Sequence, residues 1–136
     1  MHPDEELCAQ ARRAAERAYA PYSHFRVGAA LRSSDGTVFV GVNVENRSYG
    51  LTCCAERSAV FSAISAGQRS FSALAIYSPD SQDPLPPCGA CRQVISELVP
   101  PDFPVICAGA GGAVLRLTLA DLLPRDSLHD LKDRRP

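Results

Sequence analysis

The sequence predicts an α/β fold in which one mixed sheet of about five strands carries helices on both faces. Three observations support this fold class. An opening helix is followed by an alternating hairpin, two strand–helix alternations come next, and a second hairpin closes the chain. The 136 residues suffice for one core, and neither a repeat nor a domain linker interrupts them.

The first elements are a helix and a hairpin. Helix formers fill residues 4–20, with small apolar side chains at helical spacing, and Pro21 is expected to end that helix. Apolar and polar residues then alternate on both sides of a turn at Asp35-Gly36. This pattern predicts strands at about 27–32 and about 37–43, joined as a hairpin.

Strands and helices alternate in the second half of the chain. We expect a helix from Cys54 to near Gly67, a strand at 73–78 and a helix at 88–98. Two short strands within 103–109 and 113–118 follow, and then a helical turn in which Thr118 and Asp121 form a partial capping box. We predict a single catalytic domain at 1–126 and a polar, flexible C-terminal tail at 127–136.

Composition excludes several function classes. Apolar residues make up 46% of the chain, charged residues make up 21%, and the formal net charge is −1 without a basic stripe, so we expect no nucleic-acid partner. No apolar run reaches the roughly 20 residues that span a bilayer, and we expect no membrane partner. The N-terminus shows no apolar signal segment, which favours a cytoplasmic protein. In that reducing compartment six clustered cysteines indicate metal binding or catalysis.

Two cysteine motifs, each at a predicted helix start, indicate a zinc site. Cys88 and Cys91 lie three residues apart and therefore share one face of a first turn, and Cys54 opens the preceding helix. Helix N-termini stabilise the negative charge of thiolates. Three protein ligands leave the fourth position of Zn²⁺ open for water, which is typical of a catalytic site.

Glu56 and Arg57, which follow Cys54 closely, complete the predicted site. Glu56 is held beside the metal without being needed as a ligand, so it is the expected general base. Three thiolates give the zinc site a net charge of −1, and Arg57 is expected to offset it by donating hydrogen bonds to a thiolate. Cys53 falls outside the motif spacing. Cys8 and Cys107 have the pattern of core thiols, and the three histidines show no ligand spacing to one another.

Four motifs together resemble the small cytidine deaminase family of pyrimidine salvage: "CAER" at 54–57, "PCGACRQ" at 87–93, "APYSHFRVGAAL" at 20–31 and "NVEN" at 43–46. The resemblance implies a three-layer α/β/α homotetramer with one Zn²⁺ per subunit. The implied reaction is hydrolytic deamination of cytidine and 2′-deoxycytidine.

The resemblance also implies the substrate contacts. Phe25 would stack on the pyrimidine, Asn43 and Glu45 would bind the ribose 3′-hydroxyl, and the backbone of Ala55 would read the base edge. One departure lies near the C-terminus, where the family commonly carries an aromatic residue after "LLP" and this chain has Ser127 and Leu128. Tyr49 is placed either to reach a neighbouring subunit's site or simply to pack.

Alternative functions remain at this point. A deaminase of a cytosine-bearing antibiotic of the blasticidin S type shares the cysteine motifs. It is not expected to carry the full motifs at 20–31 and 43–46, to which the sugar contacts are assigned. An enzyme that edits polynucleotides would need basic charge that this chain lacks. A structural zinc module would need a fourth ligand, and a redox dithiol at Cys88 and Cys91 would leave Cys54 and Glu56 without a role.

Overall fold

A five-stranded sheet in the order β2-β1-β3-β4-β5 forms the middle layer of the molecule. The computed structural model describes residues 2–134. The strands are β1 (Gly28–Ser33), β2 (Val38–Val42), β3 (Phe71–Ser78), β4 (Pro104–Gly109) and β5 (Val114–Thr118). The helices are α1 (Pro3–Ala15), α2 (Ala55–Ser65), α3 (Gly89–Ser96) and α4 (Leu119–Leu122), with 3₁₀ turns η1 (Tyr49–Leu51) and η2 (His129–Arg134).

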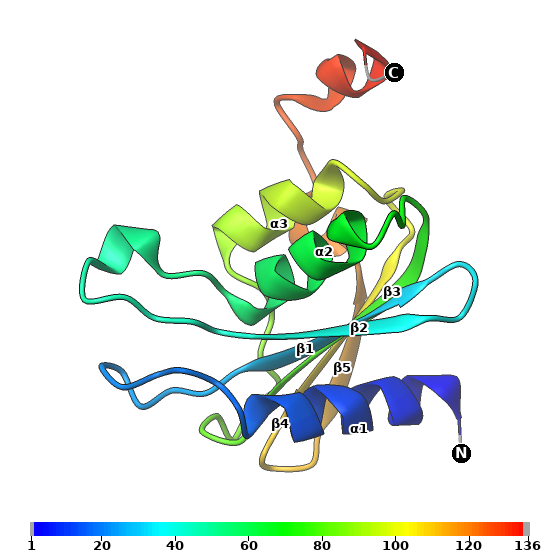
Figure 1. Ribbon diagram of the computed structural model, residues 1–136. Coiled ribbons are helices and arrows are strands. Elements are labelled where there is room, and N and C mark those ends of the chain that lie inside the picture. The colour runs from blue at the N-terminus through cyan, green and yellow to red at the C-terminus, as the bar shows by residue number, and fades with distance from the viewer. Residues whose placement is uncertain (1, 135–136) are drawn as a thin grey trace.

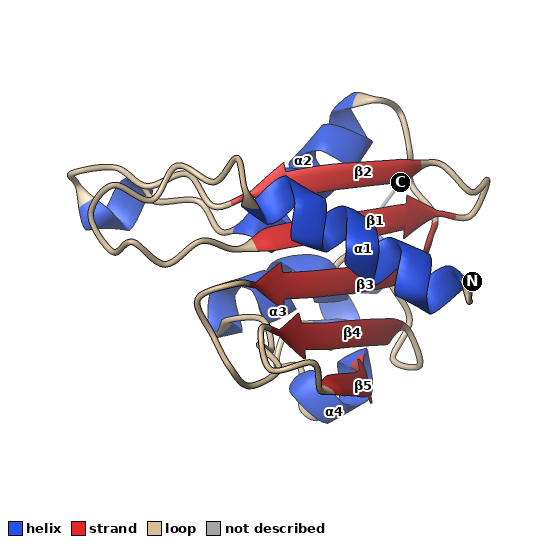
Figure 2. Cartoon of the chain, turned by 90° about the horizontal axis from the view of Figure 1, so that it is seen from below, coloured by secondary structure: helices blue, strands red, loops and turns tan. Residues whose placement is uncertain are grey.

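Helices cover both faces of this sheet, which confirms the predicted three-layer α/β/α arrangement (Figure 1). Helix α1 lies on one face, where it crosses β1 and β3 (Figure 2). Its buried side chains, Leu7, Ala11 and Ala15, meet alanines of β1 and β3. Small residues on both sides allow the helix to lie close to the sheet.

Helices α2 and α3 lie on the opposite face and pack over the larger core (Figure 1). Gly41 of β2 lies directly beneath the first turns of α2, and a side chain there would overlap the backbone of Ala55 and Ala59. This close approach fixes the height of α2 above the sheet. It therefore also fixes the position of the residues that begin the helix.

The mixed strand directions bring three chain segments to one edge of the sheet. Strand β1 is antiparallel to both neighbours, and its first residue, Gly28, pairs with Val42 near the end of β2 and with Tyr77 near the end of β3. The segment before β1 and the segments after β2 and β3 are therefore adjacent. This edge carries the predicted substrate residues.

The first helix is shorter than the sequence predicts. It ends at Ala15, not near residue 20, because Tyr19 leaves the helix to pair with the chain beyond β2. The Tyr19 N–H donates to the carbonyl of Asn43 at 3.0 Å, and the Tyr19 carbonyl accepts from the N–H of Glu45 at 2.9 Å. These tertiary hydrogen bonds override the helix propensity of residues 16–20.

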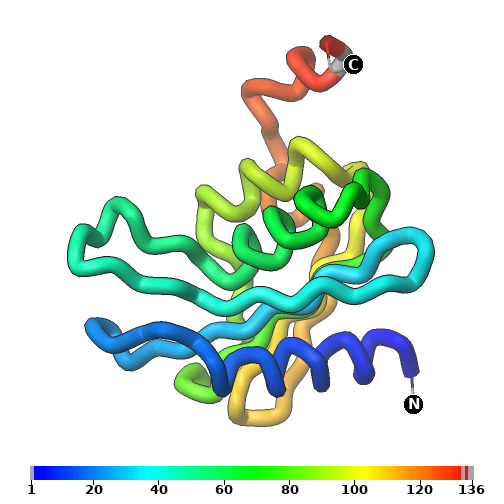
Figure 3. Tube along the Cα trace, viewed as in Figure 1, coloured from blue at the N-terminus to red at the C-terminus, as the bar shows by residue number. Residues whose placement is uncertain are grey.

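The chain ends in short helical elements. Thr118 and Asp121 form a complete capping box at the start of α4, with both reciprocal hydrogen bonds in place. Beyond α4 the chain leads to η2, which stands away from the sheet (Figure 3). Within residues 2–134, no helix combines the length and the apolar character needed to cross a membrane.

Candidate active site

The N-terminal ends of α2 and α3 meet, and each begins with a cysteine as its N-cap. Cys54 caps α2 and Cys88 caps α3, while Cys91 lies buried in the first turn of α3. The sulfur atoms of Cys54, Cys88 and Cys91 all lie within 4.8 Å of one another. The Sγ of Cys88 is 3.6 Å from that of Cys54 and 3.3 Å from that of Cys91. Tertiary structure thus brings together the three thiols that the motifs predicted.

The chemistry of these three donors suits zinc. Hydrogen bonding from Cys91, with help from Arg57, lowers the pKa of the Cys54 thiol to about 5 against the opposing effect of burial. The contact with Cys54, together with burial, raises the pKa of Cys91 well above its ordinary range. A divalent cation bound among the three sulfur atoms would stabilise all three as thiolates.

Arg57 lies where the sequence predicted it. Its Nη2 donates to the Sγ of Cys54 at 3.3 Å, and this hydrogen bond raises the pKa of the guanidinium. A fixed positive charge against one thiolate reduces the excess negative charge of the cluster. The structure therefore places a guanidinium against a thiol of the cluster, and the role of Arg57 beside a bound metal stays a prediction.

Glu56 is the acidic residue of the first turn of α2 and is only 4% exposed. Burial raises the pKa of its carboxyl group, and the nearby Cys54 thiolate adds to this effect. A carboxylate whose pKa is raised toward neutrality both accepts and returns a proton readily. Among the residues that the structure describes, the cluster of possible metal ligands holds three members and Glu56 is not one of them.

The remaining cysteines lie outside this cluster. The thiol of Cys53 donates to the carbonyl of Cys54 at 3.6 Å, and its backbone pairs in both directions with Val44. Cys107 is buried within β4, and burial raises the pKa of its thiol to about 11. Cys8 is half-buried against the core beneath α1. These environments agree with the interpretation of all three as residues without a metal-binding role.

Asn43 and Glu45 both hold the loop that precedes β1. Asn43 is 8% exposed; its Nδ2 donates to the carbonyl of Phe25 at 2.8 Å and its Oδ1 accepts from the N–H of Val27 at 2.9 Å. Glu45 accepts from the N–H groups of Tyr22 and Ser23, each at 3.1 Å, and from the Ser23 hydroxyl. The hydrogen bonds from Ser23 lower the pKa of Glu45, so its carboxylate stays ionised.

Val44, between these two residues, lies between the segment that contains Tyr19 and the segment that leads to the cysteine cluster. It bridges Tyr19 on one side and Cys53 on the other, so the line of β2 continues beyond the sheet. Cys54 follows directly after this bridge. Phe25 and Ala55 complete the predicted set, the first half-buried in the loop before β1 and the second buried as the first residue of α2.

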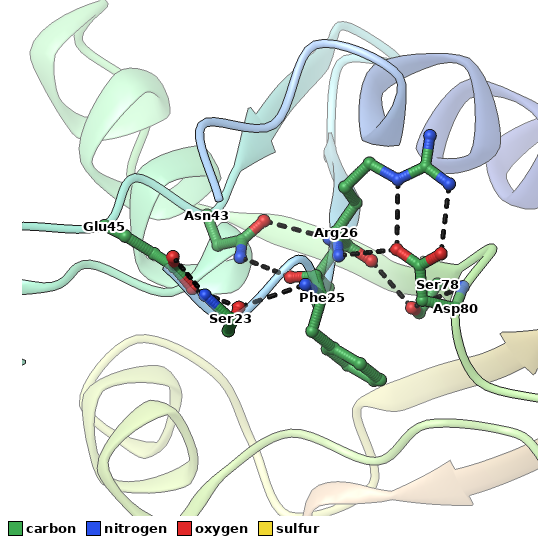
Figure 4. Close-up of polar contacts among 8 residues, drawn as sticks. Ser23, Phe25, Arg26, Asn43, Glu45, Ser78 and Asp80 are labelled. Carbon is green, nitrogen blue, oxygen red and sulfur yellow. Dashed lines mark hydrogen bonds and ion pairs between the residues drawn. The ribbon is translucent and has the colours of Figure 1, made fainter. Parts of the chain in front are cut away.

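Sequence reasoning missed supporting residues at the end of β3 and on α3. Asp80 and Ser78 contact Arg26 beside Phe25, as Figure 4 shows. Arg92 donates from Nε to the carbonyl of Pro87 at 2.8 Å and from Nη1 to the carbonyl of Leu122 at 2.9 Å, which ties the residue before Cys88 to the end of α4. The available signal was weak: polar residues directly follow the buried strand β3 at the edge that carries the site.

Three clustered thiols at two helix starts, with a buried glutamate beside them, define a zinc-dependent hydrolytic deaminase. The model of the cytidine and deoxycytidylate deaminase zinc-binding region matches residues 1–107. The chain belongs to this deaminase family.

Relatives that match most of the chain support this assignment. A cytidine deaminase of Sporosarcina psychrophila is 50% identical over 120 residues, which is 88% of each chain. One of Halalkalibacterium halodurans is 51% identical over 118 residues, 87% of this chain and 89% of that one. The crystal structure of cytidine deaminase from Burkholderia pseudomallei superimposes with a TM-score of 0.86 at 50% identity, covering 91% of this chain and 98% of that one.

A deaminase that acts on an antibiotic is a more distant relative of this chain. A blasticidin-S deaminase of Bacillus cereus is 34% identical over 105 residues, covering 72% of this chain and 74% of its own length. The cytidine deaminases named above share more residues with this chain over a longer match. The comparisons thus favour the small cytidine deaminases.

Proposed function

We propose that this chain hydrolyses cytidine and 2′-deoxycytidine to uridine and 2′-deoxyuridine. Water supplies the oxygen that becomes bonded to C4 of the pyrimidine, the bond between C4 and the exocyclic nitrogen breaks, and ammonia leaves. The observation that carries the proposal is the cluster of Cys54, Cys88 and Cys91 beside the buried Glu56. The 50% identity to curated cytidine deaminases supports the choice of substrate.

Cys54, Cys88 and Cys91 would hold one Zn²⁺ per subunit. Zinc bound by three thiolates supplies Lewis acidity that lowers the pKa of a water molecule at the remaining position. Arg57 would limit the negative charge of the thiolates, so that this acidity is retained. The start of each helix directs backbone N–H groups and the positive end of the helix dipole toward the cluster.

Glu56 would move the protons of the reaction. Its carboxylate would accept a proton from the attacking water and deliver it to N3 of the pyrimidine, and then pass the next proton to the departing amine. Both transfers need a carboxyl group with a pKa between its ordinary value and neutrality. Burial of Glu56 raises its pKa in that direction.

The predicted sugar contacts remain available beside the loop contacts. Asn43 uses one of its two amide N–H groups on Phe25, so the other is left for a ribose hydroxyl. Glu45 accepts three hydrogen bonds from the loop, and a carboxylate offers about four acceptor sites. Phe25 would stack on the base, and the N–H of Ala55, at the first position of α2, would read the base edge.

We further propose that the chain forms a homotetramer. The loop from Asn43 to Cys53 and the loop before β1 project together from the body, beyond the edge of the sheet (Figure 1). On the first of these loops Tyr49 is 79% exposed and Leu51 is 72% exposed. Two exposed apolar side chains this close together favour burial against another subunit.

The cytoplasm and pyrimidine salvage complete the proposal. All six cysteines are free thiols, and three of them must stay reduced to bind zinc. A nucleoside is the substrate class that salvage reactions recover.

The test is conversion of cytidine to uridine, followed by absorbance, with zinc-quantified protein. We expect turnover by the wild-type protein and loss of about 10²–10⁴-fold in kcat for Glu56→Ala, with zinc content unchanged, because proton transfer alone contributes that much. Lack of turnover by the zinc-loaded wild-type protein would contradict the proposed substrate. Full activity in a zinc-replete Glu56→Ala variant would contradict the role of the glutamate.

A further inference from the structure

The segment that carries Phe25 has no regular secondary structure to hold it. Residues 23–27 lie before β1, outside the sheet, and His24 adopts a left-handed conformation with φ of 58°. Such a segment stays in one conformation only if its backbone polar groups find other partners. In this protein side chains from two different strand ends supply most of those partners.

Contacts from the end of β2 hold the groups around Phe25. The N–H of Phe25 donates to the hydroxyl oxygen of Ser23 at 3.0 Å, and that hydroxyl in turn donates to Glu45. The carbonyl of Phe25 accepts from Asn43. The same residues are those expected to hold the ribose, so this side of the loop belongs to the site already described.

Contacts from the end of β3 hold the next residue, Arg26, as Figure 4 shows. Its N–H donates to Oδ2 of Asp80 at 2.8 Å, and its carbonyl accepts from the hydroxyl of Ser78 at 2.6 Å. The Arg26 guanidinium also makes a two-pronged ion pair with Asp80, with both nitrogen–oxygen distances at 3.0 Å. Both backbone groups of Arg26 and its side chain are therefore held.

Ser78 and Asp80 act as one unit. The Asp80 N–H donates to the Ser78 hydroxyl oxygen at 3.1 Å, while that hydroxyl donates to Arg26. Ser78 is fully buried, and Arg26 lowers the pKa of Asp80 to about 2, so the carboxylate is charged at any working pH. A buried hydroxyl and a bidentate carboxylate make a rigid anchor.

We propose that Ser78 and Asp80 are positioning residues for cytidine binding, because they clamp the Arg26 backbone and so hold the adjacent Phe25 ring in place against the base. The proposal rests on the proposed function, in which Phe25 stacks on the pyrimidine. The Phe25 ring extends away from the hydrogen-bonded groups, and its direction therefore depends on the backbone that carries it (Figure 4). A preorganised aromatic ring loses less entropy when a ligand binds.

The clamp is tested by steady-state kinetics of Asp80→Ala and Ser78→Ala, with zinc content and Tm recorded for each. Stacking on an aromatic ring contributes about 1–3 kcal/mol per base, and we expect the KM for cytidine to rise about tenfold. The turnover number and the zinc content are expected to stay near wild type, because neither residue contacts the cysteine cluster. Asp80→Asn is the milder variant if Asp80→Ala is poorly folded.

Asp35→Ala is the matched control. Asp35 also accepts a backbone N–H, that of Thr37 at 2.9 Å, and a side-chain donor, Gln68 at 3.1 Å, but it lies in the hairpin turn between β1 and β2. At that end of the sheet it does not touch the loop before β1. We expect its KM to match that of the wild-type protein.

A double-mutant cycle with Phe25→Ala separates positioning from general stability. If Asp80 acts through Phe25, adding Asp80→Ala to Phe25→Ala raises the KM far less than tenfold. If the effects of Asp80→Ala and Phe25→Ala on the KM are additive, the inference is overturned while the proposed function stays intact. An unchanged KM in both Asp80→Ala and Ser78→Ala has the same meaning. No cytidine turnover by the zinc-loaded wild-type protein would overturn both.

Discussion

Arg57 is the residue on which the charge of the cysteine cluster depends. It lies three residues after Cys54, and Nη2 donates directly to that sulfur. Removal of this donor leaves a thiolate less stabilised, and residues that support metal ligands typically contribute 10- to 100-fold in metal affinity. We expect Arg57→Ala to lower zinc affinity by roughly that factor, measured by competition with a chromogenic chelator.

Arg69→Ala is the control for this change. Arg69 lies beyond the other end of α2, where Nη1 donates to the carbonyl of Ile64 at 3.0 Å. The Arg69→Ala substitution removes the same type of side chain near the same helix, at a position that does not contact a cysteine. Equal loss of zinc affinity in both variants would show that helix stability, and not the contact with Cys54, is responsible.

At the scale of elements, the seating of α2 on β2 determines where Cys54 and Glu56 lie. The backbone of the first turns of α2 leaves no space for a side chain at Gly41. We expect Gly41→Ala to lower the free energy of unfolding by about 1–3 kcal/mol or more, the usual effect of overpacking. We also expect it to weaken zinc binding, because the start of α2 would be displaced. Chemical denaturation and chelator competition measure the two effects.

Gly50→Ala serves as the comparison for Gly41→Ala. An added methyl group at Gly50 meets nothing within 4 Å. Within one chain, Gly50→Ala makes the same chemical change in the exposed 3₁₀ turn η1, and we expect the free energy of unfolding of the single chain to stay near wild type. Similar destabilisation at both positions would contradict the importance of the close approach between α2 and β2.

The junction between the loop before β1 and the end of β3 should depend on pH. Arg26 lowers the folded-state pKa of Asp80 to about 2 from an ordinary value of 3.8. A lowered pKa means that the ionised carboxylate stabilises the folded state above pH 4, and that this contribution is lost as the pH falls through 2. We expect Asp80→Asn to have a lower Tm than the wild-type protein at pH 6.

The pH dependence of this difference in Tm is the measurement. It should stay constant from neutral pH down to about pH 4 and then shrink as wild-type Asp80 becomes protonated. A difference that persists unchanged down to pH 2 would show that the shape of the side chain, and not its charge, stabilises the junction.

At the scale of the whole molecule, an exposed aromatic side chain on α2 also favours assembly. Phe61 is 51% exposed on the outer side of this helix and lines a groove with Leu128. We expect light scattering to give a mass of about four times the 14.6 kDa chain for the wild-type protein, and a smaller mass for Phe61→Glu. A charge buried in an interface without a partner opposes association.

Ser62→Glu is the matched variant for this test. Ser62 is the exposed neighbour of Phe61 on α2, so the Ser62→Glu substitution adds the same charge to the same helix. We expect its mass to equal that of the wild-type protein. A wild-type protein with the mass of a single chain would contradict the homotetramer.

The chemistry of the site was predictable from the sequence because its motifs are local. Cys88 and Cys91 share one face of a helical turn, and Cys54 and Glu56 begin another helix, so residue type and local spacing indicated which groups the site contains. The strands were predicted within a residue or two for a similar reason, since alternation and the Asp35-Gly36 turn are local signals. The fold class followed from the order of these elements.

Only the tertiary structure decided how distant segments meet. Cys54 and Cys88 are 34 residues apart, and Arg26 and Asp80 are 54 apart, so no local pattern brings either pair together. The end of α1 at Ala15 was likewise decided by hydrogen bonds between Tyr19 and the chain beyond β2. The sequence by itself determined which groups the site contains, because residue type and helical spacing are local properties. The sheet decided which side chains hold the loop before β1, because those partners become neighbours only when β1 pairs with both β2 and β3.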